Sequence, residues 1–356
     1  MDAKTLNQIL EIAFSKRVSD IHFEVDNPPF FRAHGQLLRS KLASLKPADT
    51  AFIAATIMKD NQRELPPDFH EFDASYSLKT GGRFRVSMFK QRGNIGIVMR
   101  VIPPEIGNFK DLNLPPVLAE IVKAPNGLIL VTGPTGNGKS TTLAAMINYI
   151  NEKYAYNIIT IEDPIEFLFT SKKSCIIQRE VKIDTADFGS ALKASLRMDP
   201  DVIMVGELRD METIDSCIKA SETGHLVFST LHTQNTATTI NRIIGNFPPE
   251  SQEIMRHRLA DILVATVSLR LVEDKTGEDL IPVVEVMRTT TTIQACIRDG
   301  NLDEIEGHIE KGAAQYQMQS MDQHLIHLCN QGQITMKEAK RISNSMDLER
   351  KLTFTQ

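Results

Sequence analysis

The most constraining feature of this sequence is a glycine-rich segment, Gly133-Pro-Thr-Gly-Asn-Gly-Lys-Ser140, which fits the pattern GxxxxGK[ST]. An apolar run (127–133) precedes it, and a segment typical of a helix (141–150) follows it. The glycines let backbone N–H groups turn inward around a polyphosphate, and the amino end of a helix adds a positive partial charge. Because strand, loop and helix occur in this order, the sequence predicts a nucleotide-binding unit rather than a chance glycine-rich turn.

This unit supplies the candidate residues for ATP and Mg²⁺. We expect Lys139 to reach the β- and γ-phosphates of ATP, and the hydroxyl of Ser140 to bind Mg²⁺. The other candidate nucleotide-binding residues lie in the same segment and are Gly133, Thr135, Gly136, Asn137, Gly138 and Thr141.

Three further apolar runs, at 157–163, 202–207 and 225–232, lack the alternation of a half-exposed strand. Strands that are buried on both faces have this pattern, and helical segments separate the runs here. The sequence therefore predicts an α/β fold with a doubly wound parallel sheet. We expect residues 250–356 to be mostly helical.

Residues 1–102 have the pattern of a separate, small α+β domain. A helix is expected around Leu6, Ile9, Leu10, Ile12 and Ala13, and a second helix over 48–64. Strands are expected at 19–25, 72–78, 82–91 and 95–102, with a hairpin over 30–39 around Gly35. The next segment, 103–116, contains four prolines (Pro103, Pro104, Pro115 and Pro116) and is predicted to be a stiff linker, with the nucleotide-binding domain over 117–356.

Acidic residues end two of the predicted buried strands. Glu207 follows one run, and its carboxylate would lie beside the phosphate loop, where it could polarise a water molecule or hold metal-bound water. The run at 157–163 ends in two acids, Glu162 and Asp163, and a third acid, Glu166, follows it. Physical reasoning on the sequence does not choose among these three.

Two histidines, His225 and His232, flank the last of the buried runs. A histidine at a strand end near a γ-phosphate could stabilise it, although single histidines are more often structural. The two lie at opposite ends of one strand, so they cannot have the same role.

Composition narrows the class of protein. The net charge is −5, from 40 basic and 45 acidic residues, which argues against a dedicated nucleic-acid binder. The four cysteines contain no CxxC pair, so neither a zinc ribbon nor a disulfide scaffold is expected. No signal peptide is visible, and no run approaches the roughly 18 apolar residues of a membrane span. We expect a cytoplasmic protein with reduced thiols.

Four segments, in order along the chain, resemble the nucleotide-domain boxes of the type II/IV secretion ATPases, and in particular the pilus retraction ATPases of the PilT/PilU family. They are GPTGNGKST at 133–141, IITIEDPIEFL at 158–168, DPDVIMVGELRD at 199–210 and TGHLVFSTLHTQNTATTINRI at 223–243. The N-terminal segments SDIHFEV and PPFFRAHGQL are also similar to that family, so the resemblance covers nearly the whole chain.

The resemblance assigns roles to individual residues. It implies that Glu166 and Glu207 are catalytic acids and that His225 and His232 form a histidine box. It also implies that Arg85 and Arg100, in the N-terminal domain, reach the γ-phosphate. Arginine suits that role, because charge builds up on the transferring phosphoryl group and a guanidinium can stabilise it with two hydrogen bonds.

At the level of the whole protein, the resemblance implies a RecA-like P-loop domain preceded by a PAS-like domain. It implies a homo-hexameric ATPase in which the first domain rotates about the 103–116 hinge to retract a type IV pilus. The expected partners are an inner-membrane pilus platform protein, where the ring would be peripheral, and a paralogous retraction ATPase; no nucleic acid is expected.

One departure from the family keeps alternatives open. The family's motif AIRNLIR corresponds here to residues 292–298, Thr-Ile-Gln-Ala-Cys-Ile-Arg, in which Ile293, Ile297 and Arg298 are retained. The alternatives are an accessory, PilU-like ring subunit with little motor activity of its own, or a secretion-system ATPase. Pilus extension is disfavoured, since four scattered cysteines do not supply the tetracysteine zinc site of the assembly ATPases.

Overall fold

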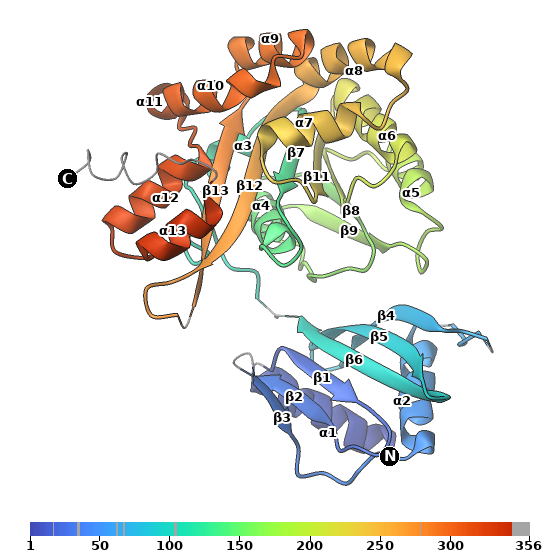
Figure 1. Ribbon diagram of the computed structural model, residues 1–356. Helices are drawn as coiled ribbons and strands as arrows, with labels where there is room; N and C mark the ends of the chain where they lie inside the picture. Colours follow the sequence, from blue (N-terminus) through green and yellow to red (C-terminus); the bar gives the residue numbers. More distant parts are fainter. Residues whose placement is uncertain are drawn as a thin grey trace. The chain divides into compact units, whose positions relative to one another are not determined.

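The computed structural model describes residues 1–16, 18–33, 36–61, 63–66, 68–102, 105–277 and 279–343. Its contacts divide the chain into two compact units. The first comprises Met1–Ile106 and Pro164–Leu168, and the second comprises Gly107–Asp163 and the chain from Phe169 onward. Each unit has its own sheet and its own hydrophobic core (Figure 1).

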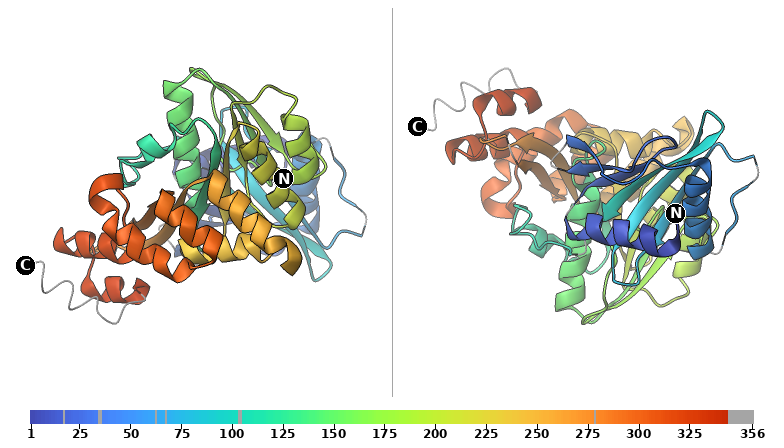
Figure 2. Two further views of the ribbon diagram at one scale, coloured as in Figure 1. Left: turned by 90° about the horizontal axis from the view of Figure 1, so that it is seen from above. Right: turned by 90° about the horizontal axis from the view of Figure 1, so that it is seen from below.

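The first unit is a six-stranded sheet in the order β3-β2-β1-β6-β5-β4. Its strands are β1 (Asp20–Phe23), β2 (Phe30–Ala33), β3 (Gln36–Arg39), β4 (Glu71–Ser77), β5 (Arg83–Gln91) and β6 (Asn94–Ile102). Helices α1 (Ala3–Ser15) and α2 (Pro47–Asp60) cover one face of this sheet (Figures 1 and 2). These elements confirm the predicted α+β domain. Gly35, the expected centre of the β2–β3 turn, lies outside the described residues.

Helix α1 shows how the sequence places these helices. The side chain of Asp2 accepts a hydrogen bond from the backbone N–H of Thr5 (2.8 Å) and so caps the helix. The buried side chains Leu6, Ile9, Leu10 and Ala13 then recur at helical spacing and face the sheet. Ile12, which we assigned to the same apolar face, is instead 53% exposed, because position 12 falls outside that stripe.

The second unit is built on a seven-stranded sheet in the order β13-β12-β7-β11-β10-β8-β9. The strands are β7 (Gly127–Thr132), β8 (Asn157–Glu162), β9 (Cys175–Glu180), β10 (Val202–Val205), β11 (Leu226–Leu231), β12 (Leu263–Glu273) and β13 (Leu280–Arg288). All neighbours pair in parallel except β12 with β13. Every residue of β7, β10 and β11 is buried, as the unbroken apolar runs predict.

Helices cover both faces of this sheet, which confirms the doubly wound architecture. Seen from above, α4 lies on one side of the strands, and α5 and α6 lie on the other (Figure 2). The helices of this unit are α3 (Leu118–Ile121), α4 (Lys139–Lys153), α5 (Phe188–Ser195), α6 (Met211–Glu222), α7 (Thr236–Ile244), α8 (Pro249–Ile262), α9 (Thr291–Asp299), α10 (Ile305–Lys311), α11 (Ala313–Tyr316), α12 (Met321–Asn330) and α13 (Met336–Ile342), with a 3₁₀ turn, η1 (Leu302–Glu304).

The prediction that residues 250–356 are mostly helical is wrong for two long strands. Strand β12 extends the parallel sheet beside β7, and β13 forms its antiparallel edge. Helix α8 ends at Ile262 and β12 begins at Leu263, with no glycine or proline between them. The sequence therefore carries no boundary signal at that point. Strand β9 was also not predicted from the sequence.

The segment predicted as a linker belongs in part to each unit, because the boundary between the two units falls between Ile106 and Gly107. Residues Gly107 onward group with the second unit, where Phe109 stacks on Tyr149 of α4 with ring centroids 5.2 Å apart. Leu114 is buried there. Pro103 and Pro104 lie outside the described residues.

Candidate functional site

The glycine-rich loop joins the end of β7 to the start of α4, and its backbone conformation requires glycine at two positions. Gly138 has a φ of 81°, a left-handed conformation that glycine adopts readily, and it is the residue directly before the helix. At Gly133, with φ 142°, a β-carbon would lie 2.4 Å from the carbonyl oxygen of Leu269. No larger residue fits at Gly133, so the loop can pass this close to β12 only as glycine.

Asn137 ties the same loop to the neighbouring strand. Its Oδ1 accepts a hydrogen bond from the backbone N–H of Leu271 in β12 (2.7 Å), and its Nδ2 donates to the carbonyl of Thr135 (3.3 Å). The side chain therefore braces the loop from the side, while the loop backbone stays available. This contact gives asparagine a structural role at position 137.

Lys139 is the first residue of α4 and is 8% exposed. Its Nζ donates to the carbonyl oxygens of Gly133 (2.9 Å) and Pro134 (3.1 Å), and it lies 3.2 Å from Nδ1 of His232. Ser140 follows in the first turn of the helix, where backbone N–H groups have no partner within the helix. A lysine, a hydroxyl and the positive end of a 15-residue helix thus converge on the loop.

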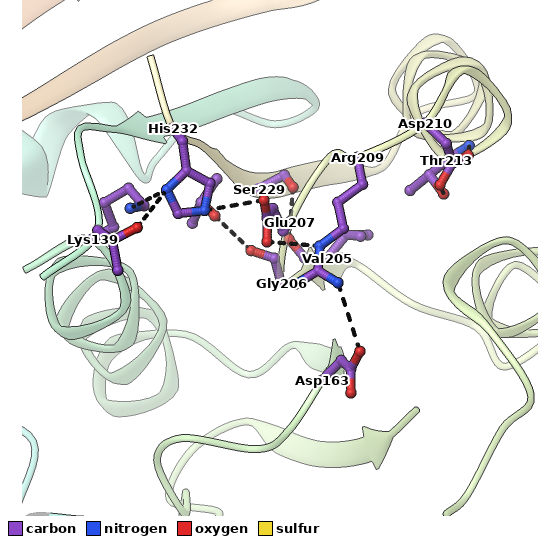
Figure 3. Close-up of polar contacts among 12 residues, drawn as sticks. Lys139, Asp163, Val205, Gly206, Glu207, Arg209, Asp210, Thr213, Ser229 and His232 are labelled. Atoms are coloured by element: carbon purple, nitrogen blue, oxygen red, sulfur yellow. Dashed lines mark hydrogen bonds and ion pairs between the residues drawn. The ribbon is translucent and has the colours of Figure 1, made fainter. Parts of the chain in front are cut away.

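Glu207 and His232 follow two adjacent parallel strands, β10 and β11, and their side chains meet at one edge of the sheet. Oε1 of Glu207 lies 3.1 Å from Nε2 of His232, whose other ring nitrogen faces Lys139 (Figure 3). The lysine ammonium can only donate, so Nδ1 of His232 accepts and Nε2 carries the proton that points to Glu207. His232 therefore connects the phosphate-loop lysine to the carboxylate.

The backbone under Glu207 is held by two side chains of β11. The hydroxyl of Ser229 donates to the carbonyl of Val205 (2.7 Å), and that of Thr230 donates to the carbonyl of Gly206 (2.7 Å). Because both hydroxyls lie within the sheet, they fix the point at which β10 ends and Glu207 leaves it.

The structure separates the three acids at and after the end of β8. Glu162 is buried, and its Oε1 accepts hydrogen bonds from the hydroxyl of Thr160 (2.7 Å) and the amide of Gln178 (3.1 Å). Asp163 lies 3.9 Å from a guanidinium nitrogen of Arg209 (Figure 3). Of the three, Asp163 is the one connected to the Glu207 group, since Nε of Arg209 donates to Oε2 of Glu207 (2.9 Å).

Glu166, the acid that the resemblance selects, belongs by its contacts to the first unit. One of its carboxylate oxygens lies 3.6 Å from a guanidinium nitrogen of Arg85 in β5. The backbone of the same loop is held nearby, because Nε of Arg83 donates to the carbonyl of Ile165 (3.3 Å). The contacts of Glu166 are therefore with the arginine-bearing strand.

Arg85 and Arg100 are directly opposite each other on β5 and β6. Both lie on the face away from α1 and α2, because the alternate residues Phe84 and Val86 are buried in the core. Asp20 of β1 pairs with Arg100 in register, and its Oδ1 accepts from Nε of Arg100 (2.9 Å). The row therefore holds two guanidinium groups, each with one carboxylate partner, Glu166 for Arg85 and Asp20 for Arg100.

His225 does not join the phosphate loop. It lies directly before the amino end of β11, about 20 Å along the strand from His232. Its Nδ1 lies 3.0 Å from the carbonyl of Ala220 and 3.2 Å from the hydroxyl of Thr223, at the last turn of α6. The structure therefore brings together Lys139, Glu207 and His232, and places His225 at a helix end.

Sequence reasoning missed two charged residues connected to this site. Arg209 contacts both Glu207 and Asp163, and its signal was the sequence Glu-Leu-Arg directly after the strand. Glu285 in β13 is 4% exposed, and its Oε1 accepts from the backbone N–H (2.9 Å) and hydroxyl (2.8 Å) of Thr236 and from Ser268 (3.2 Å). Burial raises the pKa of Glu285 above its usual value.

The Glu285 contacts continue to the phosphate loop. The hydroxyl of Thr132, the last residue of β7, donates to that of Ser268 (3.1 Å), which in turn donates to Glu285. Thr236 begins α7 a few residues after His232. A buried carboxylate thus connects the strand that carries the loop to the segment that carries the histidine, through residues far apart in the sequence.

The residues of the loop fit a nucleoside polyphosphate and a divalent ion. Gly136 and Gly138 are open on their β-carbon side, so a ligand can approach the backbone there. The ammonium of Lys139 and the amino end of α4 supply positive charge, and the hydroxyl of Ser140 is a hard oxygen ligand of the kind that Mg²⁺ prefers. A carboxylate and a histidine at the same edge can hold or orient water beside the phosphates.

Comparison with known proteins identifies relatives along most of the chain. It is 42% identical over 88% of its length to the twitching motility protein of Neisseria gonorrhoeae, of which it covers 83%. It is 39% identical over 94% of its length to the type IV pilus retraction ATPase PilT of Pseudomonas aeruginosa, of which it covers 97%. Among solved structures, it matches a crystal structure of the pilus retraction motor PilT with bound ADP, with a TM-score of 0.88, 42% identity, and coverage of 97% of this chain and 99% of that one.

The RecA-like P-loop architecture and the ATPase class both follow from these matches. The family model described as "Type II/IV secretion system protein" matches residues 2–341, almost the whole chain. The chain therefore belongs to the type II/IV secretion system protein family and is an ATPase of that family.

Proposed function

We propose that this chain is a hexameric motor that uses ATP hydrolysis to retract a type IV pilus. The observation that carries the proposal is the group formed by Lys139, His232 and Glu207, which joins a phosphate-binding lysine to a carboxylate at one sheet edge. The similarity along 94% of the chain to a pilus retraction ATPase supplies the kind of work to which hydrolysis would be coupled.

In this proposal the loop residues bind the triphosphate of ATP. Backbone N–H groups from Gly133 to Thr141 surround the phosphates, and Lys139 exchanges its carbonyl and imidazole contacts for β- and γ-phosphate oxygens. Ser140 would hold Mg²⁺, which would supply positive charge beside the phosphates. The side chain of Asn137 keeps the loop against β12 while the backbone binds.

Glu207 is the residue that we assign to the attacking water. Its carboxylate lies at the strand end, partly exposed, with His232 on one oxygen and Arg209 on the other. These two contacts orient the carboxylate without burying it, so it can accept a proton or a hydrogen bond from water. Through His232, its orientation depends on Lys139, and therefore on whether phosphate is bound.

The arginine row of the first unit supplies charge stabilisation from a second subunit. Arg85 and Arg100 present two adjacent guanidinium groups on the open face of their sheet, where each could form two hydrogen bonds with a γ-phosphate. A ring of identical subunits would bring such a face to a neighbour's nucleotide. Glu166 then acts through Arg85, which it contacts, as well as in the catalytic role that the resemblance gives it.

Movement of the first unit would be the mechanical step. We assign the hinge to the predicted linker 103–116. From Gly107 onward this segment groups with the second unit, where Phe109 stacks on Tyr149. None of the helices described is long and apolar enough to span a bilayer. We place the ring on the cytoplasmic side of the inner membrane, held there by a pilus platform protein, with a paralogous ATPase as a second partner.

One observation favours a second candidate function. Helix α9 contains the residues that stand in place of the family's AIRNLIR motif, and it has Gln294, Ala295 and Cys296 where the motif has Arg, Asn and Leu. An accessory ring that assists another retraction ATPase would tolerate this change.

The proposal is tested by comparing the wild type with Glu207→Gln, first as purified protein and then in the source bacterium. We expect Mg²⁺-dependent ATPase activity that falls by roughly 10²–10⁴-fold in the variant, with ATP binding retained. The matched control is Glu212→Gln, five positions along, whose carboxylate pairs with Lys193 on the surface. Cells carrying Glu207→Gln should keep long surface pili and lose twitching motility.

Two outcomes would contradict the motor. Wild-type protein no faster than Glu207→Gln would remove the ATPase basis of the proposal. Pilus retraction that survives Glu207→Gln but is lost on deletion of the whole chain would instead identify an accessory ring.

A further inference from the structure

Three side chains with metal-binding atoms meet in the C-terminal helices, apart from the phosphate loop. They are Cys296 in α9, Glu304 at the end of η1, and His308 in α10. The sulfur, a carboxylate oxygen and an imidazole nitrogen all lie within 4.8 Å of one another. Over the described ranges, this is the one group of three or more such side chains found at metal-binding distances.

The chain path that brings them together is fixed by the fold. Helix α9 ends at Asp299, the next residue, Gly300, has a φ of 79° and turns the chain back, and η1 leads directly into α10. Glu304 and His308 are four residues apart, so they lie on one face of the helical turn, with Nε2 of His308 3.9 Å from Oε2 of Glu304. Buried Leu302 and Ile305 hold this turn against the core. The donor atoms are therefore held by packed backbone and not by a loose loop.

The electrostatics of the group favour a divalent cation. Cys296 is 5% exposed, and a carboxylate oxygen of Glu304 lies within 4.8 Å of its sulfur, so negative charge is already present beside the thiol. A metal ion would replace the thiol proton, which leaves to solvent as the sulfur–metal bond forms. One thiolate and one carboxylate would then balance the two positive charges of the ion, with His308 as a neutral ligand.

We propose that Cys296, Glu304 and His308 form a binding site for Zn²⁺, with water in the fourth position. Thiolate and imidazole are ligands that zinc accepts and that Mg²⁺ and Ca²⁺ do not favour, and a tetrahedral ion with three protein ligands is a common zinc geometry. Sequence spacing did not reveal the site, because it contains one cysteine and no CxxC pair. Closing the donor atoms around an ion needs only small side-chain movements, since Glu304 is largely exposed.

The ion would join α9, η1 and α10 into one unit. Helix α9 carries residues 292–298, which stand where the family has its AIRNLIR motif, and Cys296 is one of the departures. The metal would brace this helix at the position where the motif has leucine. The site is separate from nucleotide binding, and it holds whether or not the chain is a retraction motor.

Cobalt titration of the full-length chain, stripped with a chelator and free of nucleotide, tests the proposal. We expect about one equivalent of Co²⁺ per chain with a thiolate-to-cobalt charge-transfer band, displaced by Zn²⁺ and unaffected by excess Mg²⁺. Cys296→Ala should abolish the band and weaken Zn²⁺ binding by at least about tenfold. Cys329→Ala, a partly buried cysteine outside the group, and Lys139→Ala should both retain the band.

The charge-transfer band distinguishes this site from an ion bound adventitiously by Glu207 and His232, since that pair offers no sulfur. If Cys296→Ala fails to fold, Glu304→Gln and His308→Asn replace it as test variants. Each should bind Zn²⁺ at least about tenfold more weakly than the wild type. Zn²⁺ should also raise the Tm of the wild type more than that of these variants. The proposal would be overturned if the Co²⁺ spectrum of the wild type matched that of Cys296→Ala. It would also be overturned if the spectra of both single variants, His308→Asn and Glu304→Gln, matched that of the wild type.

Discussion

The two ends of strand β11 carry the same residue type with different consequences. At the carboxyl end, His232 lies between Lys139 and Glu207. Before the amino end, His225 contacts the carbonyl of Ala220 in the last turn of α6. Helices that follow parallel strands begin at the carboxyl edge and end near the amino edge, so the first edge offers N–H donors and the second offers carbonyl oxygens. One strand therefore has a histidine between a lysine and a carboxylate at one end and a histidine that contacts a helix end at the other.

The largest effect at the carboxyl edge is expected from Lys139→Ala. The lysine supplies the one ammonium group that the loop directs at the phosphates, and we expect its loss to lower ATPase activity by roughly 10³-fold. Fluorescent-nucleotide binding and steady-state hydrolysis measure this. Lys153→Ala, in the exposed last turn of the same helix, is the matched control and should stay within about twofold of the wild type. Equal losses in both variants would indicate a damaged helix rather than a lost phosphate contact.

Glu285 tests whether the carboxyl edge depends on its buried support. In Glu285→Ala, the backbone N–H and hydroxyl of Thr236 and the hydroxyl of Ser268 lose their acceptor. We expect the free energy of unfolding to fall by about 2–4 kcal/mol, since each buried polar group left without a partner is costly. Urea unfolding measures it. Glu285→Gln keeps an acceptor oxygen and should lose much less; the same loss in both would show that the hydrogen bonds are not the cause.

The raised pKa of Glu285 adds a pH dependence with a definite sign. As pH rises above the unfolded value, the unfolded chain releases this proton while the folded chain still holds it. The stability that the group contributes is therefore complete at low pH and is lost as pH rises through the folded pKa. The difference in unfolding free energy between wild type and Glu285→Gln should fall as pH rises through the raised pKa of Glu285. A difference independent of pH would mean that the pKa of Glu285 is not raised.

The features that sequence could predict are local, and those it missed are not. Strand β7, the loop and Lys139 occupy residues 127–139, so one short stretch of sequence contains the apolar run, the glycines and the start of the helix. Glu285 and its partner Thr236 are separated by 49 positions, and Asn137 and Leu271 by 134. Both contacts depend on where β12 and β13 join the sheet, and no boundary signal separates β12 from α8. The surroundings of Glu162, Asp163 and Glu166 could not be predicted for a related reason, because the side chains that they contact, Gln178, Arg209 and Arg85, come from other elements.

The smallest effect is expected at the amino edge of the sheet, and it tests the difference between His225 and His232. His225→Asn removes an imidazole contact with the end of α6, so we expect about 1 kcal/mol less stability and ATPase activity within about twofold of the wild type. His232→Asn removes a ring that joins Lys139 to Glu207, and activity should fall by roughly tenfold or more, since hydrogen bonds to charged groups contribute about 1.5–3 kcal/mol. Thermal unfolding and steady-state ATPase assays on both variants, assembled as full rings, separate the two roles. Because the proposed ring brings surfaces of neighbouring subunits together, a large loss of activity in His225→Asn with unchanged stability would place that histidine at a subunit boundary and would contradict the structural role assigned to it here.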